Sequence, residues 1–144
     1  MKFTLEMAKD LRACSSGVEW YKNNGQPKTV EKTIAALLLS SEPEKYQWSS
    51  WLLSRMLIRK DNIRYAVFAA QQVLDIFEKK YLTDKRPRLA IEAVLKCIGD
   101  DSESNRKAAY AAAAAASAAA AASDAAKNEM LLKIINYGLT LVEE

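Results

Sequence analysis

The densest group of side chains that could do chemistry is KKYLTDKRPR, residues 79–88. Its cations, set against the one acid Asp84, are Lys79, Lys80, Lys85, Arg86 and Arg88. Clustered ammonium and guanidinium groups attract phosphates or an acidic protein surface. Because Tyr81 is the only aromatic residue nearby and no nucleic-acid-binding motif is present, an acidic protein partner is favoured over nucleic acid.

The same cations also have two structural explanations. The plainest is a solvated connection between helices, in which cations at the C-terminal end of a helix offset its dipole. Alternatively, Arg86 or Arg88 pairs as a fork with Glu78 or Glu92 and fixes the angle between two helices. Charge reversal separates a contact surface from an ion pair that joins two helices. It weakens partner binding in the first case and unfolds the protein in the second.

Most catalytic and metal-binding chemistry lacks its residues in this chain. There is no histidine, which removes the imidazole base, the Ser-His triad and the usual zinc sites. No Gly-rich phosphate-binding motif occurs, and the carboxylate pairs 100–101 and 143–144 fall where helix ends belong. We therefore expect a non-enzyme with no catalytic, cofactor-binding or metal-binding residues and no cofactor.

Composition favours a folded, helix-rich protein of the cytoplasm. Of the 144 residues 50% are hydrophobic and 27% charged, with only 4 Gly and 3 Pro. The N-terminal MKFTLEMAKD carries several charges and has no signal-peptide core, and the longest uncharged run, 108–123, is too short and weakly apolar to span a membrane. We accordingly expect Cys14 and Cys97 to be reduced, buried thiols.

Hydrophobic periodicity predicts helices throughout and no strand. The expected helices are residues 5–13; one behind Ser16 that ends at Asn24-Gly25; one opened by Thr29; one whose first turn is Glu42-Pro43-Glu44 and which runs through Trp48, Trp51 and Leu57; one capped by Asp61; one with Pro87 in its first turn that closes at Gly99; and one from Asp101 or Ser102 to about Leu141.

Two of these helices carry apolar stripes that predict packing. After Asp61 the stripe steps by four and three along Ile63, Val67, Ala70, Leu74, Phe77 and Tyr81, a seam matched to a neighbouring helix. The next helix has Ile91, Val94, Leu95 and Ile98 on one face, and Arg88, Glu92 and Lys96 on the opposite face. Trp20, Trp48 and Trp51 are interpreted as core anchors in preference to a binding platform.

Alanine fills fifteen of the nineteen positions 108–126. Because alanine has the highest helix propensity and little bulk, we expect a slim central helix around which larger side chains pack. Tyr110, Ser117 and Asp124 interrupt it at intervals of seven and so share one stripe. This stripe is the solvent-facing edge of the helix, a recognition strip for a partner, or a polar seam; repeat expansion without function also accounts for the tract.

Residues 63–98 resemble a family of bacterial and phage proteins described as immunity proteins. The most specific residues are Asp75-Ile76-Phe77-Glu78, Asp84-Lys85-Arg86-Pro87-Arg88 and Ala90-Ile91-Glu92-Ala93. The alanine-rich helix and the segments CSSGVEWYKNNG and YQWSSWLL are also similar, although Leu82 stands where the family often has proline. The resemblance implies a protein that binds and neutralises a toxin or another enzyme, and it supplies no catalytic residue.

Together these observations predict an all-α, single-domain helical bundle with a long alanine-rich C-terminal helix packed against the others. Residues 1–41 form its N-terminal helical segment and residues 42–144 its main bundle. The expected function is that of a protein-binding inhibitor or immunity-type factor, a monomer or homodimer with no membrane partner. Two alternatives remain: a nucleic-acid-associated accessory protein that uses residues 79–88, and a structural protein that self-associates through the alanine helix.

Overall fold

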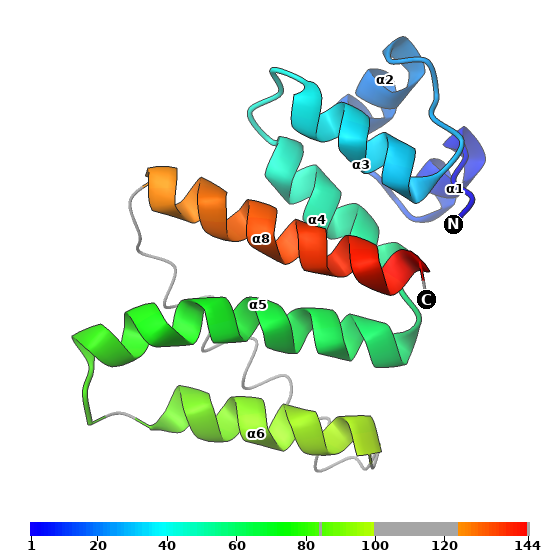
Figure 1. The fold of residues 1–144 in the computed structure, drawn as a ribbon. Coiled ribbons are helices and arrows are strands. Elements are labelled where there is room, and N and C mark those ends of the chain that lie inside the picture. Colours follow the sequence, from blue (N-terminus) through cyan, green and yellow to red (C-terminus); the bar gives the residue numbers. More distant parts are fainter. Residues whose placement is uncertain (84, 100–123, 144) are drawn as a thin grey trace. The chain divides into compact units, whose positions relative to one another are not determined.

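The computed structural model describes residues 1–83, 85–99 and 124–143, and the regular elements in these ranges are helices (Figure 1). They are α1 (Leu5–Asp10), α2 (Ser15–Asn23), α3 (Val30–Leu39), α4 (Lys45–Met56), α5 (Arg59–Lys80), α6 (Arg86–Gly99) and α8 (Asp124–Glu143). Within these ranges β-pairing is limited to one isolated antiparallel bridge between Lys2 and Thr29. The predicted all-α class is confirmed.

The chain divides into two compact units by its internal contacts. The first unit comprises Met1–Leu57 and Ile135–Glu144, and the second comprises Ile58–Ile134. Helix α4 therefore belongs with α1, α2 and α3, while α5 and α6 belong to the second unit. The division falls within α8.

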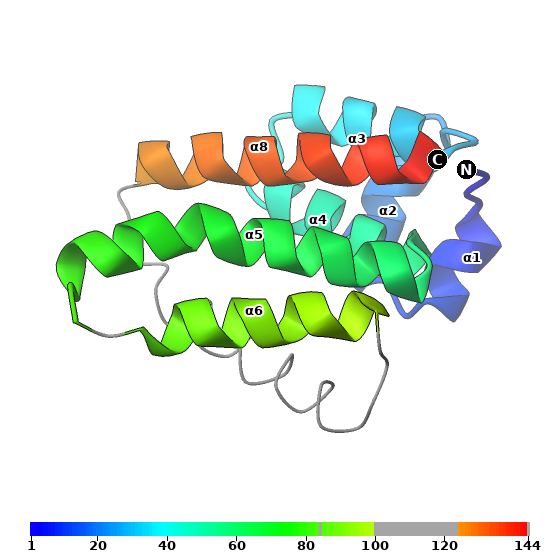
Figure 2. The ribbon, with the colours of Figure 1, turned by 60° about the horizontal axis from the view of Figure 1, so that its bottom comes forward.

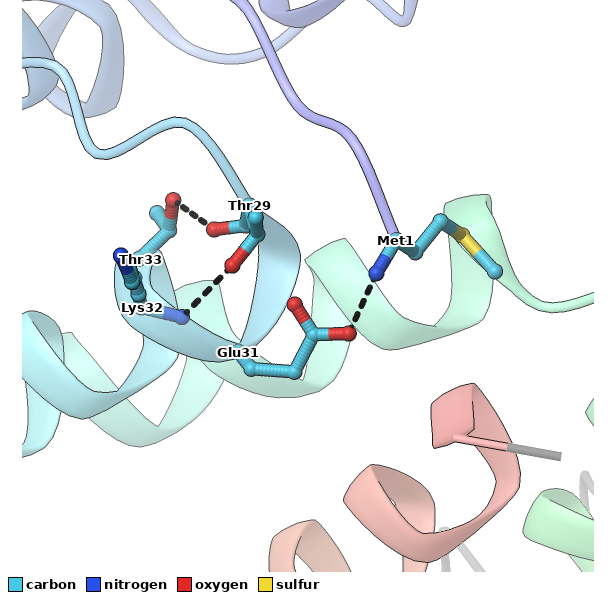
Figure 3. A network of polar contacts seen from close by, with 5 residues as sticks. All are labelled: Met1, Thr29, Glu31, Lys32 and Thr33. Carbon is cyan, nitrogen blue, oxygen red and sulfur yellow. Dashed lines mark hydrogen bonds and ion pairs between the residues drawn. The ribbon is translucent and has the colours of Figure 1, made fainter.

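Helix α3 begins where the sequence predicts, behind Thr29. The Thr29 Oγ1 accepts a hydrogen bond from the Lys32 backbone N–H at 3.3 Å, and the Thr33 hydroxyl donates to the Thr29 carbonyl at 2.8 Å (Figure 3). The Glu31 carboxylate in the same turn pairs with the Met1 ammonium group. This network fixes the start of α3 and holds the first residues of the chain beside it.

Helices α2 and α4 begin at residues other than those predicted. Cys14 is the N-cap of α2, although its side chain makes no capping hydrogen bond, so the predicted cap Ser16 lies inside the helix. Helix α4 begins at Lys45, so the acidic segment 42–44 precedes the helix instead of forming its first turn. The Lys45 Nζ donates to the carbonyls of Leu38 and Ser40 at 3.0 and 3.1 Å, which satisfies carbonyls at the end of α3.

Helices α2 and α1 are both followed by a residue in the left-handed conformation. Gly25, with φ +77°, lets α2 end as predicted, and the Gln26 N–H donates back to the Tyr21 carbonyl at 3.2 Å. Helix α1 ends three residues earlier than predicted, at Asp10. Its reversal is made by Arg12, which takes the left-handed conformation without being glycine.

In the second unit α5 and α6 lie side by side (Figures 1 and 2). Val67, Ala70 and Leu74 of α5 form a buried cluster with Ile91 of α6, and Ile63 packs against this cluster. The predicted seam is therefore confirmed over these positions, because residues three and four apart share one helix face.

Three details of this unit differ from the prediction. Helix α5 begins at Arg59, so Asp61 lies in its first turn and pairs with Arg64 at 3.2 Å instead of capping the helix. Tyr81 follows the end of α5 and is 48% exposed, so the seam stops before it. Leu95 is 44% exposed and does not share the burial of Ile91.

Helix α8 ends at Glu143, close to the predicted Leu141. Its predicted start at Asp101 or Ser102 lies outside the described residues, as does most of the alanine tract. Buried side chains on the described part of α8 are those of Ile134, Ile135, Leu141 and Val142.

Candidate functional site

The connection between α5 and α6 is closed by an ion pair. The Arg88 Nε donates to the Glu78 Oε1 at 2.9 Å, and the Arg88 Nη2 donates to the Glu78 Oε2 at 2.6 Å. Glu78 lies in the last turn of α5 and Arg88 in the first turn of α6. This is one of the forked pairings that the sequence suggested, and Arg88 therefore has a structural role in joining the two helices.

The surroundings of the Glu78 carboxylate favour its ionised form. Its hydrogen bonds to Arg88 lower the pKa of Glu78 below the usual value, and the charges of Arg88 and Lys85 act in the same direction, while partial desolvation opposes them. Glu92, the other predicted partner of Arg88, is exposed.

The other cations of residues 79–88 stand close to this pair in the sequence. Lys79 and Lys85 are exposed, whereas the side chains of Lys80 and Arg86 lie outside the described part of the structure. Between them the connection carries two apolar side chains, Tyr81 at 48% and Leu82 at 77% exposure. We call the exposed group Lys79, Tyr81, Leu82 and Lys85 the connection surface.

Helix polarity divides the cations of this surface into two kinds. Lys79 belongs to the end of α5, where a positive charge offsets the helix dipole. Lys85 precedes α6 and accepts the Leu89 N–H through its carbonyl at 3.0 Å, which makes Lys85 the N-cap. The first turn of α6 contains no acid. A cation in this place is unfavourable for the dipole of α6 by about 0.3–1 kcal/mol. Lys85 is, however, also attracted to the Glu78 carboxylate, whose pKa its charge lowers.

The structure does not describe the second predicted surface, the stripe on the alanine-rich segment. Tyr110 and Ser117 lie outside the described residues, and so does the side chain of Asp124, the first residue of α8. Among residues whose placement is described, no three Cys, Asp or Glu side chains gather as a metal site. In the same part of the chain, no helix has the length and apolar character needed to cross a membrane.

The tryptophans do more than the predicted anchoring of a core. Trp20 is buried, but Trp48 and Trp51 are only half-buried, and all three line an open pocket of about 340 Å³ in the first unit. Cys14, predicted to be buried, is an exposed free thiol at this pocket. The signal available in the sequence was Gly17 within a helix, because glycine there indicates a close approach by another group.

Comparisons of the chain with protein-family models, curated proteins and solved structures gave no significant match. The resemblance of residues 63–98 to immunity proteins therefore stays a prediction.

Proposed function

We propose that this protein is a non-catalytic, cytoplasmic inhibitor or immunity-type factor that binds an acidic patch on a toxin or another enzyme. It uses the connection surface between α5 and α6. The observation that carries this proposal is the exposure of Lys79, Leu82 and Lys85 along one short connection, where cations stand in the sequence on both sides of an exposed aliphatic side chain. An acidic partner would pair with the two exposed cations of this surface.

Apolar exposure favours a protein partner over nucleic acid. Leu82 is 77% exposed between the two lysines, and Tyr81 stands beside it. An exposed aliphatic side chain gains from desolvation against an apolar counterpart, and aromatic residues are enriched at protein interfaces. A phosphate backbone offers no such counterpart to Leu82.

The Arg88–Glu78 pair supports the same proposal by limiting the freedom of the connection. Two parallel hydrogen bonds hold the ends of α5 and α6 together, so fewer conformations of residues 79–85 are lost on binding. In this scheme Arg88 positions the surface and Lys85 contacts the partner.

The test begins with affinity capture from a lysate of the native organism and continues with the purified partner. Lys85→Glu and Leu82→Asp are each expected to weaken binding about tenfold or more, with the helical circular dichroism unchanged. Lys96→Glu is the matched control, because Lys96 is an exposed cation further along α6. Equal binding by all three variants would contradict the proposal.

Salt dependence separates the nucleic-acid alternative. If the captured partner is a nucleic acid, affinity falls steeply with salt and Leu82→Asp has little more effect than any added negative charge. Self-association through the alanine-rich segment would instead appear as a concentration-dependent mass in sedimentation experiments, unaffected by Lys85→Glu.

A further inference from the structure

The first unit contains an open, mostly apolar pocket of about 340 Å³. Its apolar walls come from four helices and the N-terminal segment, and include Phe3, Trp20, Leu37, Trp48, Trp51 and Leu52. A pocket of this size, with apolar walls and few polar groups, is typical of small-molecule sites. All three tryptophans of the chain line it, so indole rings form part of its wall.

Gly17 keeps one wall of this pocket open. A Cβ added at Gly17 would lie 3.3 Å from the Cys14 Sγ and 4.0 Å from the Cδ2 and Cε2 atoms of Trp48. An added methyl group would therefore make ordinary van der Waals contact with the Trp48 ring and a tight contact with the Cys14 sulfur. A larger side chain at this position would occupy space beside the indole.

The polar groups of the pocket divide into committed and available ones. The Tyr21 hydroxyl donates to the Pro27 carbonyl at 2.7 Å, and burial raises the pKa of Tyr21, so this group remains a protonated donor. The Thr33 hydroxyl donates to the Thr29 carbonyl at 2.8 Å. Arg12 and Gln47, both exposed, also line the pocket, and neither side chain has a hydrogen-bonding partner among the described residues.

Charge further restricts what the pocket can hold. Of the residues that the structure describes, Arg12 is the one cation in the wall of this pocket, and no described Asp or Glu lines it. An anion therefore meets an attractive charge here, whereas an ammonium group meets only repulsion.

Arg12 occupies a backbone position that normally selects glycine. Its φ is +59°, and the reversal of α1 depends on it: the Ala13 N–H donates to the Ala8 carbonyl and the Arg12 N–H to the Lys9 carbonyl, each at 2.9 Å. A residue with a Cβ in this conformation costs about 1–2 kcal/mol relative to the right-handed region. Strained residues of this kind are found more often at binding sites than elsewhere, and Arg12, unlike the left-handed Gln26, lines the pocket.

From these observations we propose that the pocket binds a small planar aromatic carboxylate. The ring stacks among Trp20, Trp48 and Trp51, and the carboxylate pairs with Arg12, aided by the Gln47 amide. This site lies wholly in the first unit and is independent of the connection surface.

The test uses three probes of one shape and different charge: 2-naphthoate, 2-naphthylmethanol and 2-naphthylmethylamine. Because the chain has only three tryptophans, its three indole N–H signals in a ¹⁵N–¹H correlation spectrum all report on this pocket. We expect 2-naphthoate to shift these signals in a saturable manner and to bind roughly 3- to 10-fold more tightly than the alcohol. The amine is expected to bind more weakly than either.

Two variants of Arg12 make the assignment specific. Arg12→Gly and Arg12→Ala should each reduce the affinity for 2-naphthoate to that for the alcohol and leave the affinity for the alcohol unchanged. Arg12→Lys should keep part of the preference for the anion. The proposal is overturned if 2-naphthoate gives no saturable shift, if it binds no better than the alcohol, or if the preference survives in Arg12→Gly. Absence of binding by all three probes would mean that protein fills the pocket in solution.

Discussion

Arg88 and Glu78 meet through two hydrogen bonds, of 2.9 and 2.6 Å, and thereby join the first turn of α6 to the last turn of α5. Arg88→Glu should lower the unfolding midpoint, because it places two carboxylates together. The swapped pair Glu78→Arg with Arg88→Glu should recover most of the loss, since each new charge also suits its helix end. Thermal denaturation of the single and double variants measures the coupling, with Lys96→Glu as the control. If the losses simply add in the double variant, Arg88 and Glu78 do not act as a clamp.

The Glu31 carboxylate predicts a pH dependence of stability. Burial alone would raise its pKa, but hydrogen bonds from the Met1 ammonium group and the Thr29 side chain lower it below the usual value. The ionised form therefore stabilises the folded state. This stabilisation is complete above the pKa of an unfolded glutamate, about 4.3, and disappears as the pH falls through the lower pKa of the folded protein.

Urea denaturation between pH 7 and pH 2 tests this dependence. Glu31→Gln should reduce the free energy of unfolding at pH 7 and flatten its decline in acid. Glu78 contributes in the same direction through its own lowered pKa, so Glu78→Gln serves as a comparison and only the double variant removes both contributions. If Glu31→Gln leaves the decline of the free energy of unfolding in acid unchanged, the Glu31 carboxylate is not the source of that decline.

Ser49 predicts a stabilising substitution. It is fully buried on α4, and its hydroxyl has no hydrogen-bonding partner among the described residues. Ser49→Ala removes an unsatisfied polar group and raises helix propensity, so we expect a gain of about 1 kcal/mol. Ser54→Ala on the same helix is the control, because the Ser54 hydroxyl donates to the Trp51 carbonyl at 2.7 Å. If both variants gain the same stability, the higher helix propensity of alanine accounts for the whole effect.

Much of the fold could be predicted from local signals. Thr29 as the cap of α3, Gly25 at the end of α2 and the seam that joins Val67, Ala70 and Leu74 to Ile91 were all read correctly. Each depends on residues within one or two helical turns, where capping chemistry and periodicity act directly.

The rest depended on contacts that sequence spacing does not contain. Periodicity placed Trp48 and Trp51 toward the interior, but whether another helix covers them is a property of tertiary packing, and they line an open pocket instead. For the same reason, several forked partners were possible for the cations of residues 79–88, and only the structure paired Arg88 with Glu78.

The early end of α1 could not be predicted from the sequence, because arginine occupies a position where glycine usually marks the end of a helix. The last prediction replaces this arginine. Arg12→Gly should stabilise the protein by about 0.5–1 kcal/mol, because glycine relieves the left-handed strain while increasing the entropy of the unfolded chain. Arg12→Ala removes the same charge but keeps the strain, so it should give no such gain. Gly25→Ala is the opposite control: a Cβ at Gly25 meets nothing within 4 Å, yet its φ of +77° should make alanine destabilising by about 1 kcal/mol. Denaturation midpoints of the three variants measure these effects. If the Arg12→Gly variant is more stable but no longer prefers 2-naphthoate to the alcohol, the native arginine serves binding at a cost in stability. If Arg12→Gly is no more stable than Arg12→Ala, the left-handed turn carries no strain and the conformation of Arg12 gives no support to the proposed site.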